Sequence, residues 1–268
     1  MLIDAAVRTD VGRVRLRNED SYGLFSDMTF YVVADGMGGH VGGEIASEMA
    51  VETMLLSLRE TQNEDLTPLL DSEGLCSVGG RRLFLAVQEA NRKLFEKSFQ
   101  DPQLAGMGTT VAAVLFEEQE NLASVCHVGD SRVYRVRGRQ IEQLTEDHSL
   151  VQQLFRAGTI SRQKLKTSPH RHVLTRALGV ELMVQPSVRI EKPQVGDLFL
   201  LCSDGVHEVV DEAEILSVVT QEGVDLQEAC DALVTMANNR GGQDNSTVIL
   251  LRYSALEGGD ANPDLTRY

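Results

Sequence analysis

The chain of 268 residues is 42% hydrophobic and 24% charged, a composition typical of a globular protein that is long enough to bury a sizeable core. Its 25 Lys and Arg residues and 40 Asp and Glu residues give a formal net charge of −15. A chain this acidic lacks the positive surface that binds nucleic acid, so we expect no nucleic-acid partner.

Neither a secretion signal nor a membrane span is expected. Residues 1–15 contain no apolar core of signal-peptide length, and no later apolar run approaches the length of a membrane helix. The four cysteines are scattered without a C-x-x-C pair, which predicts neither disulfides nor a zinc site: Cys76, Cys126, Cys202 and Cys230. We expect a cytoplasmic location, and a monomer with no membrane partner.

The first predicted elements are a strand over Leu2–Val7 and a charged turn from Arg15 to Asp20. Glu19 and Asp20 are adjacent acids that repel each other when both are ionised and close together, so a buried pair would favour a bound cation. Taken alone, the segment favours an exposed charged turn.

A short apolar run, Phe30–Ala34, predicts a buried strand that ends at Asp35. Gly36 opens a glycine-rich stretch whose backbone can approach a ligand closely, and helical spacing of apolar residues follows from Glu44 to about Arg59. A carboxylate beside accessible backbone carbonyls suits a hard divalent cation. The alternatives are a plain strand-to-helix turn, only slightly less favoured, and a phosphate-binding loop, which lacks the expected G-K-[ST] ending.

The middle of the chain predicts a polar loop over residues 60–80, a helix over Arg81–Phe99 and then short strands joined by hairpins. These strands are expected at Thr109–Phe116, Leu122–Val128, Val133–Val136 and Ile141–Leu144. Asp130 falls in a turn between two of them, where an aspartate ordinarily closes an Asx turn.

Beyond this point, Ser149 opens a predicted helix that ends at Gly158. The basic segment 158–172 is either a landing site for a phosphorylated partner or an ordinary solvated face. Capping boxes at Asp211 and Asp225 predict two more helices. Further strands are expected at Leu174–Gly179, Val184–Ile190, Leu198–Cys202 and Val248–Tyr253, followed by a flexible tail over residues 254–268.

Three acids stand at strand boundaries beside glycine or small polar residues: Asp35, Asp204 and Asp244. Three more could join them at one rim of a sheet core: Glu19, Asp20 and Asp130. Carboxylates and backbone carbonyls without a matching His or Cys cluster favour Mg²⁺ or Mn²⁺ over zinc. Two such ions sharing a carboxylate can acidify a bridging water, and Arg15 would supply a guanidinium for a phosphate oxyanion.

In its motifs and their order, the chain resembles the bacterial members of the PPM (PP2C-type) metal-dependent serine/threonine protein phosphatases. The matching segments are R-x-x-N-E-D at 15–20, V-A-D-G-M-G-G-H at 33–40, G-T-T at 108–110, G-D-S-R at 129–132, T-E-D-H-S at 145–149, L-T-R-A-L-G at 174–179, S-D-G at 203–205 and Q-D-N-S-T at 243–247. Each segment is a weak signal alone, whereas the ordered set is very specific.

The resemblance implies one phosphatase domain over residues 1–253 with an α+β fold. Two mostly antiparallel sheets would pack face to face, flanked by helix pairs, in a four-layer α-β-β-α sandwich. A small mobile flap would lie beside the active site at about residues 150–173.

The resemblance also implies which acids hold metal. Asp35 would bridge two Mn or Mg ions, and Asp204 and Asp244 would ligate one of them. Asp130 matches the position of a third, weaker metal in bacterial members, with Asp204 shared.

The other metal would be held by Glu19 and Asp20, partly through water, and by the carbonyl of Gly36. Arg15 would bind the substrate phosphate. The implied reaction is hydrolysis of phosphoserine and phosphothreonine on proteins by a metal-bridged water or hydroxide, which would reverse a bacterial Ser/Thr kinase.

One residue departs from the animal members of the family, where a histidine proposed as the general acid follows the Asp-Gly pair. Met37 stands there in this chain, as in the bacterial branch, and methionine cannot donate a proton. His40 lies three residues further on and cannot be assumed to replace it.

Two other functions stay open beside the favoured protein phosphatase. One is a non-catalytic binding or scaffold protein on the same fold, which the presence of Asp35, Asp204 and Asp244 argues against. The other is an enzyme acting on a metabolite or nucleotide phosphoester, since the groups named here contact phosphate and metal rather than the rest of the substrate.

Overall fold

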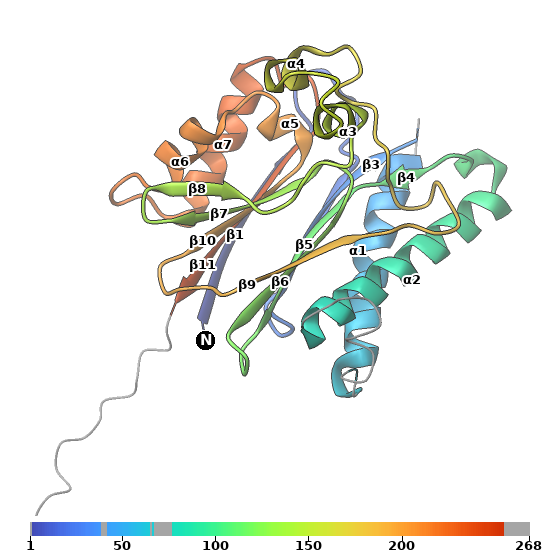
Figure 1. Ribbon diagram of the computed structural model, residues 1–268, viewed down its shortest axis with the longest axis horizontal. Coiled ribbons are helices and arrows are strands. Elements are labelled where there is room, and N and C mark those ends of the chain that lie inside the picture. Colours follow the sequence, from blue (N-terminus) through green and yellow to red (C-terminus); the bar gives the residue numbers. More distant parts are fainter. Residues whose placement is uncertain (1, 39–41, 65, 67–76, 255–268) are drawn as a thin grey trace, which may run out of the picture.

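The computed structural model describes residues 2–38, 42–64, 66 and 77–254. Its strands form two antiparallel sheets that lie face to face (Figure 1). The first sheet has the order β1 (Leu2–Asp10), β11 (Ser246–Ser254), β10 (Leu198–Cys202), β7 (Arg132–Arg137) and β8 (Gln140–Gln143). The second has the order β2 (Asp20–Phe25), β3 (Phe30–Met37), β5 (Val111–Glu117), β6 (Leu122–Val128) and β9 (Ser187–Glu191), with β4 (Gly108–Thr109) also paired to β3.

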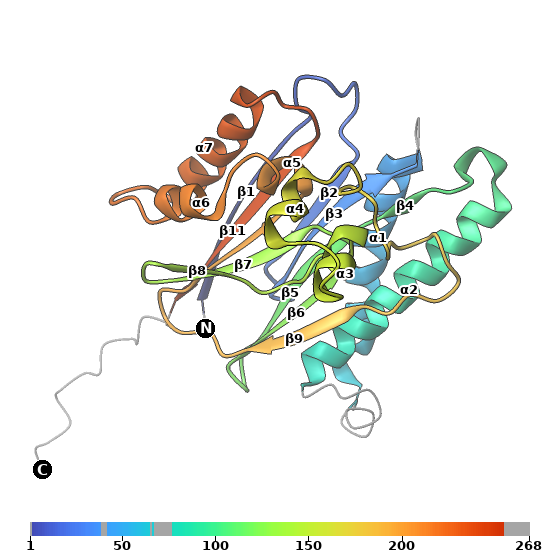
Figure 2. The same ribbon diagram turned by 45° about the horizontal axis from the view of Figure 1, so that its top comes forward.

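Helices cover the outer face of each sheet (Figure 2). The second sheet is covered by α1 (Gly42–Glu60) and α2 (Val78–Gln100), and the first by α6 (Glu212–Val219) and α7 (Leu226–Asn239). Shorter helices are α3 (Leu150–Arg156), α4 (Arg162–Thr167), α5 (Asp204–His207), and the 3-10 turns η1 (Thr61–Asn63) and η3 (Pro102–Leu104). The predicted four-layer α-β-β-α sandwich is confirmed.

The alternation of side chains along β3 explains both its apolar sequence and the position of Asp35. Phe30 and Val32 pack towards α1 and α2, whereas Tyr31 and Val33 pack between the sheets. Because side chains alternate along a strand, Asp35 continues the face of Tyr31 and Val33. The strand therefore delivers this carboxylate to the rim of the space between the two sheets.

Aromatic side chains hold the two sheets together below that rim. The ring of Phe116 on β5 meets Tyr31 edge-on at a centroid distance of 6.2 Å and Phe199 of β10 at 5.3 Å. Edge-to-face contacts of this kind add to the free energy gained by burying the rings. The rim residues therefore stand on a base of packed, buried side chains.

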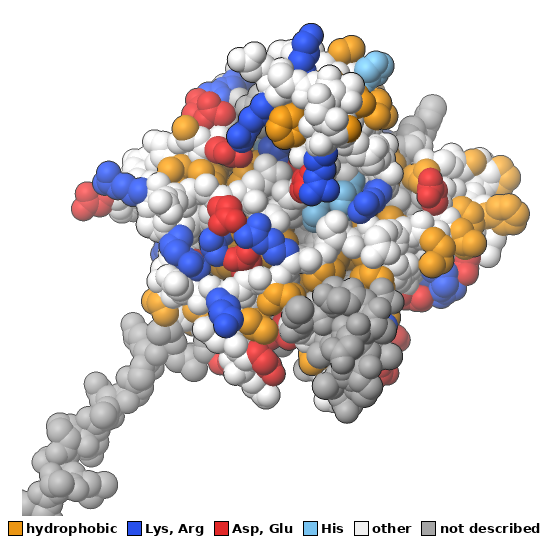
Figure 3. Space-filling view, in the orientation of Figure 1, with side chains coloured by type: hydrophobic (Ala, Val, Ile, Leu, Met, Phe, Trp, Pro, Cys, Tyr) orange, Lys and Arg blue, Asp and Glu red, His pale blue; other side chains and the backbone are white. Residues whose placement is uncertain are grey.

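Ion pairs tie the two sheets along one edge, where Figure 3 shows blue and red side chains side by side over the middle of the face. Glu142 of β8 accepts from Arg135 of β7 and from Arg189 of β9, each at 2.6 Å. Glu191 of β9 pairs with both arginines as well.

In the part of the chain that is described, no helix is both long and apolar enough to cross a membrane.

The predicted strand Leu174–Gly179 is wrong. Its residues make only isolated bridges, Ser149 with Leu174 and Thr109 with Leu178. Ala177 and Leu178 are buried all the same, so the apolar pattern reflects a loop packed on the core. The predicted strand over Thr109–Phe116 is divided at Thr110, whose N–H leaves the ladder to donate to the carbonyl of Asp35 at 2.9 Å.

Other expectations concern helix ends. Both capping boxes form, because Asp211 and Asp225 each exchange hydrogen bonds with the glutamate three residues on. Ser149 caps α3 through its side chain as predicted. Most of the predicted loop over residues 60–80, together with His40, Cys76 and the tail from residue 255, lies outside the described residues.

Candidate metal centre

Asp20 and Asp35 lie directly opposite each other in the antiparallel β2–β3 ladder. Burial, followed by repulsion from Asp20 and Asp204, raises the pKa of Asp35 well above its usual value. Asp130 and Asp244 add to this repulsion. The strand register therefore brings two predicted metal ligands together, and the loops bring the others within electrostatic reach of them.

Asp20 is held by hydroxyls from the opposite sheet. Its Oδ2 accepts from Ser203 Oγ at 2.8 Å and from Thr247 Oγ1 at 2.7 Å, while its Oδ1 is buried without a partner. Burial raises the pKa of Asp20 to about 7, although the two hydroxyl bonds oppose this shift. One carboxylate oxygen is thus held by two hydroxyls, and the other is buried without a hydrogen-bond donor.

Asp204 begins α5 directly after β10 and, like Asp20, has one carboxylate oxygen without a partner. Its Oδ1 is also buried without a partner. Burial, then repulsion from Asp244 and Glu208, raises the pKa of Asp204 to about 6. Burial and the charge of Asp204 in turn raise the pKa of Asp130 well above its usual value. The carbonyl of Asp130 accepts from Nε2 of His207, in the helix that Asp204 begins, at 2.9 Å.

The turn that carries Glu19 is anchored by Asn245. The amide of Asn245 accepts from the Glu19 N–H at 2.8 Å and donates to the carbonyl of Arg17 at 2.9 Å. Burial raises the pKa of Glu19, with Arg15 opposing and Asp244 reinforcing the shift. Arg15 and Arg17 are exposed, as the sequence alone favoured, whereas Glu19 is half-buried and Asp20 is buried.

Gly36 must be glycine because the backbone is crowded there. A Cβ at this position would lie 2.1 Å from the carbonyl oxygen of Gly43 and 2.6 Å from that of Glu19. The Gly36 N–H donates to the Glu19 carbonyl at 3.1 Å. The close approach holds the start of α1, the end of β3 and the Glu19 turn against one another.

Arg15 and Asp244 form an ion pair at the mouth of this group, with Arg15 Nη2 2.7 Å from Asp244 Oδ2. The other oxygen of Asp244 accepts from the N–H of Asn245 at 2.9 Å. Among the described residues, no three His, Cys, Asp or Glu side chains are arranged as they stand to hold a metal ion. Asp244 and Asp20 each turn a carboxylate oxygen towards donors of the chain itself.

The predicted flap contains α3 and α4, which lie above the ends of the sheets in Figure 1. Part of its basic segment is paired: Arg171 lies 3.2 Å and His172 3.6 Å from the carboxylate of Glu208, just after α5. These contacts join the flap to the element that carries Asp204.

The comparison with known families settles the family. The sequence pattern of protein phosphatase 2C matches residues 13–241. The chain belongs to the protein phosphatase 2C family. Its relatives include the serine/threonine phosphatase stp of Listeria innocua, 38% identical over 258 residues, with 95% of this chain and 98% of the relative covered. The protein phosphatase PhpP of Streptococcus pneumoniae is 33% identical over 252 residues, covering 93% and 97%.

Solved structures of the protein phosphatase 2C type share the fold. The serine/threonine phosphatase PstP/Ppp of Mycobacterium tuberculosis superposes with a TM-score of 0.82 at 31% identity, covering 95% of this chain and all of that one (100%). The catalytic domain of PstP in complex with two manganese ions gives a TM-score of 0.80 at 31% identity, covering 94% and 99%.

Two unpaired buried oxygens indicate that the residues of this protein phosphatase 2C family member fit a divalent cation. Asp20 Oδ1 and Asp204 Oδ1 are both buried without a hydrogen-bond partner, and such an oxygen costs free energy unless something binds it. Burial raises the pKa of several of the clustered carboxyls, which is the expected result where negative charges lack a counter-charge. Hard oxygen donors of this kind match Mn²⁺ and Mg²⁺.

The sequence reasoning did not assign the residues that hold the acids in place. These are Thr109, Thr110, Ser203, Asn245 and Thr247, all of which lie in the quoted motifs. The Thr109 hydroxyl donates to the carbonyl of Asp35 at 2.9 Å, and Thr110 Oγ1 accepts from the Asp35 N–H at 3.1 Å. Their place beside the acids in G-T-T, S-D-G and Q-D-N-S-T was the available signal.

Proposed function

We propose that this chain hydrolyses phosphoserine and phosphothreonine on proteins at a dinuclear Mn²⁺ or Mg²⁺ centre, and so reverses the action of a bacterial Ser/Thr kinase. The observation that carries the proposal is the convergence of Asp20, Asp35 and Asp204 in a buried group, whose members form no ion pair with a basic side chain among the described residues. Membership of a family whose relatives are named serine/threonine phosphatases supports it.

The metal ligands proposed from the sequence divide into two sets. Asp35 would serve both ions. The ligands of one ion would be Asp204 and Asp244, and those of the other would be Glu19, Asp20 and the carbonyl of Gly36. Asp130 would hold a third and weaker ion, with Asp204 shared.

The chain itself supplies phosphate binding and orientation. When bound, the two ions lower the pKa of a water so that it can attack phosphorus at neutral pH. Arg15 stands at the mouth of the group and presents a guanidinium that can bind two phosphate oxygens. Ser203 and Thr247 keep Asp20 Oδ2 occupied, which leaves only Oδ1 of that carboxylate free to face a cation.

No side chain is assigned to protonate the departing serine or threonine oxygen. Met37 follows the Asp35–Gly36 pair, and its thioether carries no proton to give. We propose that water supplies this proton.

The remaining proposals concern the whole chain. Residues 1–253 belong to one phosphatase domain, and residues 150–173 are its mobile flap. The enzyme is a monomer in the cytoplasm. Cys126, Cys202 and Cys230 are buried free cysteines, which supports a reducing compartment.

Release of phosphate from phosphothreonine peptides tests the function. The chain, stripped of metal with a chelator, should lose this activity and regain it with Mn²⁺ or Mg²⁺. Full activity after verified metal removal would contradict the two-metal proposal. Release of phosphate from nucleotides or sugar phosphates, with none from phosphopeptides, would move the chain to a different substrate class.

A further inference from the structure

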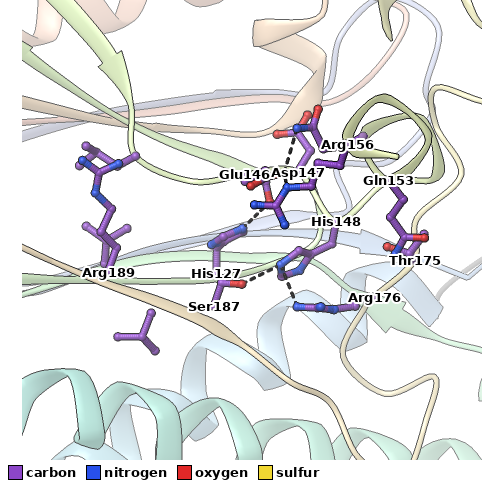
Figure 4. A pocket seen from close by; sticks show the side chains of 14 residues that line it. His127, Glu146, Asp147, His148, Gln153, Arg156, Thr175, Arg176, Ser187 and Arg189 are labelled. Carbon is purple, nitrogen blue, oxygen red and sulfur yellow. Dashed lines mark hydrogen bonds and ion pairs between the residues drawn. The ribbon is translucent and has the colours of Figure 1, made fainter. Parts of the chain in front are cut away.

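A second hollow of about 240 Å³ lies at the base of the flap (Figure 4). None of the proposed metal ligands is among the described residues that line it. Its walls come from α3, from the segment before α3 and from the loop over residues 174–176, together with β6 and β9. The hollow therefore holds none of the proposed metal ligands, and the proposed function leaves it without a role.

The hydrogen bonds of His148 fix its tautomer. His148 Nδ1 accepts from the N–H of Gly129 at 3.2 Å, so this nitrogen carries no proton. Burial lowers the pKa of His148 to about 3, and the ring is neutral. The ring proton is consequently on Nε2, which donates to Ser187 Oγ at 3.0 Å.

Arg176 meets the same nitrogen as a second donor. Its Nη1 lies 3.2 Å from His148 Nε2, and Figure 4 shows the two contacts converging on the ring. Because Nε2 already bears a proton and Arg176 can only donate, this contact joins two donors and is not a favourable hydrogen bond. Two positively polarised groups thus converge at one point on the wall of the hollow.

Arg176 also differs from the other charged groups of the hollow in having no carboxylate partner among the described residues. Its other bond runs from Nη1 to the carbonyl of Gln185 at 3.1 Å. The two acids of the hollow are compensated: Glu146 pairs with Arg156 at 2.5 Å, and Asp147 pairs with Arg132 at 2.7 Å.

The third arginine, Arg189, is likewise compensated by two glutamates of the inter-sheet network. Thr175 adds one more unsatisfied group, since its Oγ1 is buried without a partner and its side chain lines the hollow. A hydroxyl in this state lowers stability unless a ligand binds it. The N–H of Thr175 donates to the carbonyl of His148 at 2.8 Å, so the two residues are neighbours in the fold.

We propose that this hollow binds a phosphate group, held by the Arg176 guanidinium, His148 Nε2–H and the Thr175 hydroxyl. An acceptor oxygen that takes an N–H of Arg176 replaces its contact with a second donor by a charge-assisted hydrogen bond, and the Nε2–H of His148 can turn from Ser187 Oγ to another oxygen of the same group. The phosphate is either free inorganic phosphate or a second phosphorylated residue of a substrate protein. The bound group bridges α3 to the loop over residues 174–176 and so steadies the base of the flap.

Calorimetric titration of the Mg²⁺-loaded full chain with inorganic phosphate tests the site without reference to turnover. The Arg15→Gln variant, which removes the proposed phosphate ligand of the metal centre, should keep a saturable phosphate site. Adding Arg176→Gln should weaken that site by at least about tenfold, and Arg176→Lys by less. Arg139→Gln, the same charge change on the exposed β7–β8 turn, should leave it unchanged.

Thr175→Val distinguishes a phosphate-binding role of the Thr175 hydroxyl from a purely structural one. Removing an unpaired buried hydroxyl should raise Tm in the absence of phosphate, and the same change should reduce the rise in Tm that phosphate produces. Loss of stability in both conditions would mark Thr175 as structural only. Equal phosphate affinity with and without Arg176, or the absence of a saturable site in Arg15→Gln, overturns the proposal.

Peptides separate the two sources of the phosphate group. If the source is a second phosphorylated residue, a doubly phosphorylated peptide binds at least about tenfold tighter than its singly phosphorylated form, and Arg176→Gln removes the difference. If both peptides bind alike while inorganic phosphate still binds through Arg176, the site serves the free ion. Both outcomes require Arg176.

Discussion

Arg15 Nη2 lies 2.7 Å from Asp244 Oδ2, so the arginine proposed to bind phosphate shares an ion pair with a proposed metal ligand. The side chains are 50% and 34% exposed. Ion pairs this exposed contribute about 0–1 kcal/mol to stability, so exchanging Asp244 for a phosphate costs Arg15 little. The pair keeps the guanidinium close to the acids without fixing it there.

Replacing Arg15 should therefore weaken phosphate binding more than it alters folding. We expect Arg15→Gln to raise KM for phosphopeptides by roughly 10- to 100-fold, the effect of losing a hydrogen bond to a charged group. Asp244, released from its partner, should bind Mn²⁺ at least as well as before. Arg17→Gln is the matched control, since among the described residues the Arg17 side chain pairs only with Glu44, at 3.3 Å. A similar rise in KM for both variants would contradict the assignment.

Asp35→Asn should separate metal binding from folding. Because burial and neighbouring carboxylates raise the pKa of Asp35, its charge destabilises the metal-free chain at neutral pH, and the neutral amide should raise Tm in chelator. With Mn²⁺ the order should reverse, since the metal loses a charged ligand. Activity should fall by at least about 10²-fold.

The control for this change is Asp27→Asn, which alters an exposed aspartate paired with Arg59 at 3.2 Å. It should leave both Tm values and turnover close to those of the wild type. If Asp35→Asn lowers Tm in chelator as well as in Mn²⁺, the carboxylate is part of a stabilising network and the metal assignment fails.

The acids of the proposed site could be located in the sequence because they stand at the ends of recognisable strands. Uninterrupted apolar runs at Phe30–Ala34 and Leu198–Cys202 predict strands buried on both faces, and each run stops at a site acid or one residue short of it. What could not be predicted depends on partners distant in sequence. Arg15 and Asp244 are 229 residues apart, and no local pattern links them.

The error over Leu174–Gly179 has a similar cause. An apolar segment of this length fits a strand or a packed loop equally well, and the deciding bonds come from outside it. The N–H groups of Thr175 and Leu178 donate to the carbonyls of His148 and Thr109. The loop also carries Arg176 into the second hollow, a consequence that required the fold.

Acid should destabilise the chain through its buried neutral histidines. Burial lowers the pKa of His148 to about 3, against about 6.5 when unfolded. Between these values the unfolded chain binds more protons than the folded chain. The contribution of His148 to the free energy of unfolding is therefore complete above about pH 6.5 and is lost as the pH falls. One such histidine contributes at most about 1.4 kcal/mol per pH unit.

His148→Asn should test this contribution, because the amide oxygen can accept from Gly129 as Nδ1 does. The free energy of unfolding, measured in urea at pH 7 and pH 5, should fall less for the variant than for the wild type. His170→Asn, at an exposed flap position, should behave as the wild type does. Equal slopes for all three chains would show that His148 does not titrate differently on unfolding.

Met37 lies at the end of β3, next to Gly36. It pairs with Gly108 across β3 and β4, and its side chain lines a hollow of about 370 Å³ shared with Thr175 and Arg176. A Cβ on Gly108 would lie 2.9 Å from Met37 Cε, so the thioether packs closely on this glycine. The position next to Gly36 is therefore occupied by an apolar side chain with room beyond it.

Without a positioned acid, the rate should depend steeply on the leaving group. Phosphate-monoester hydrolysis has a loose transition state in which the departing oxygen gathers charge, and a general acid contributes roughly 10²–10⁴-fold. Across a series of aryl phosphates, log kcat should fall steeply as the leaving-group pKa rises. Met37→His should flatten this dependence and help alkyl phosphates most, because an imidazolium can protonate the oxygen. The rival is His40. If His40→Ala slows phosphoserine turnover while sparing activated aryl phosphates and metal affinity, the proton comes from His40 and not from water.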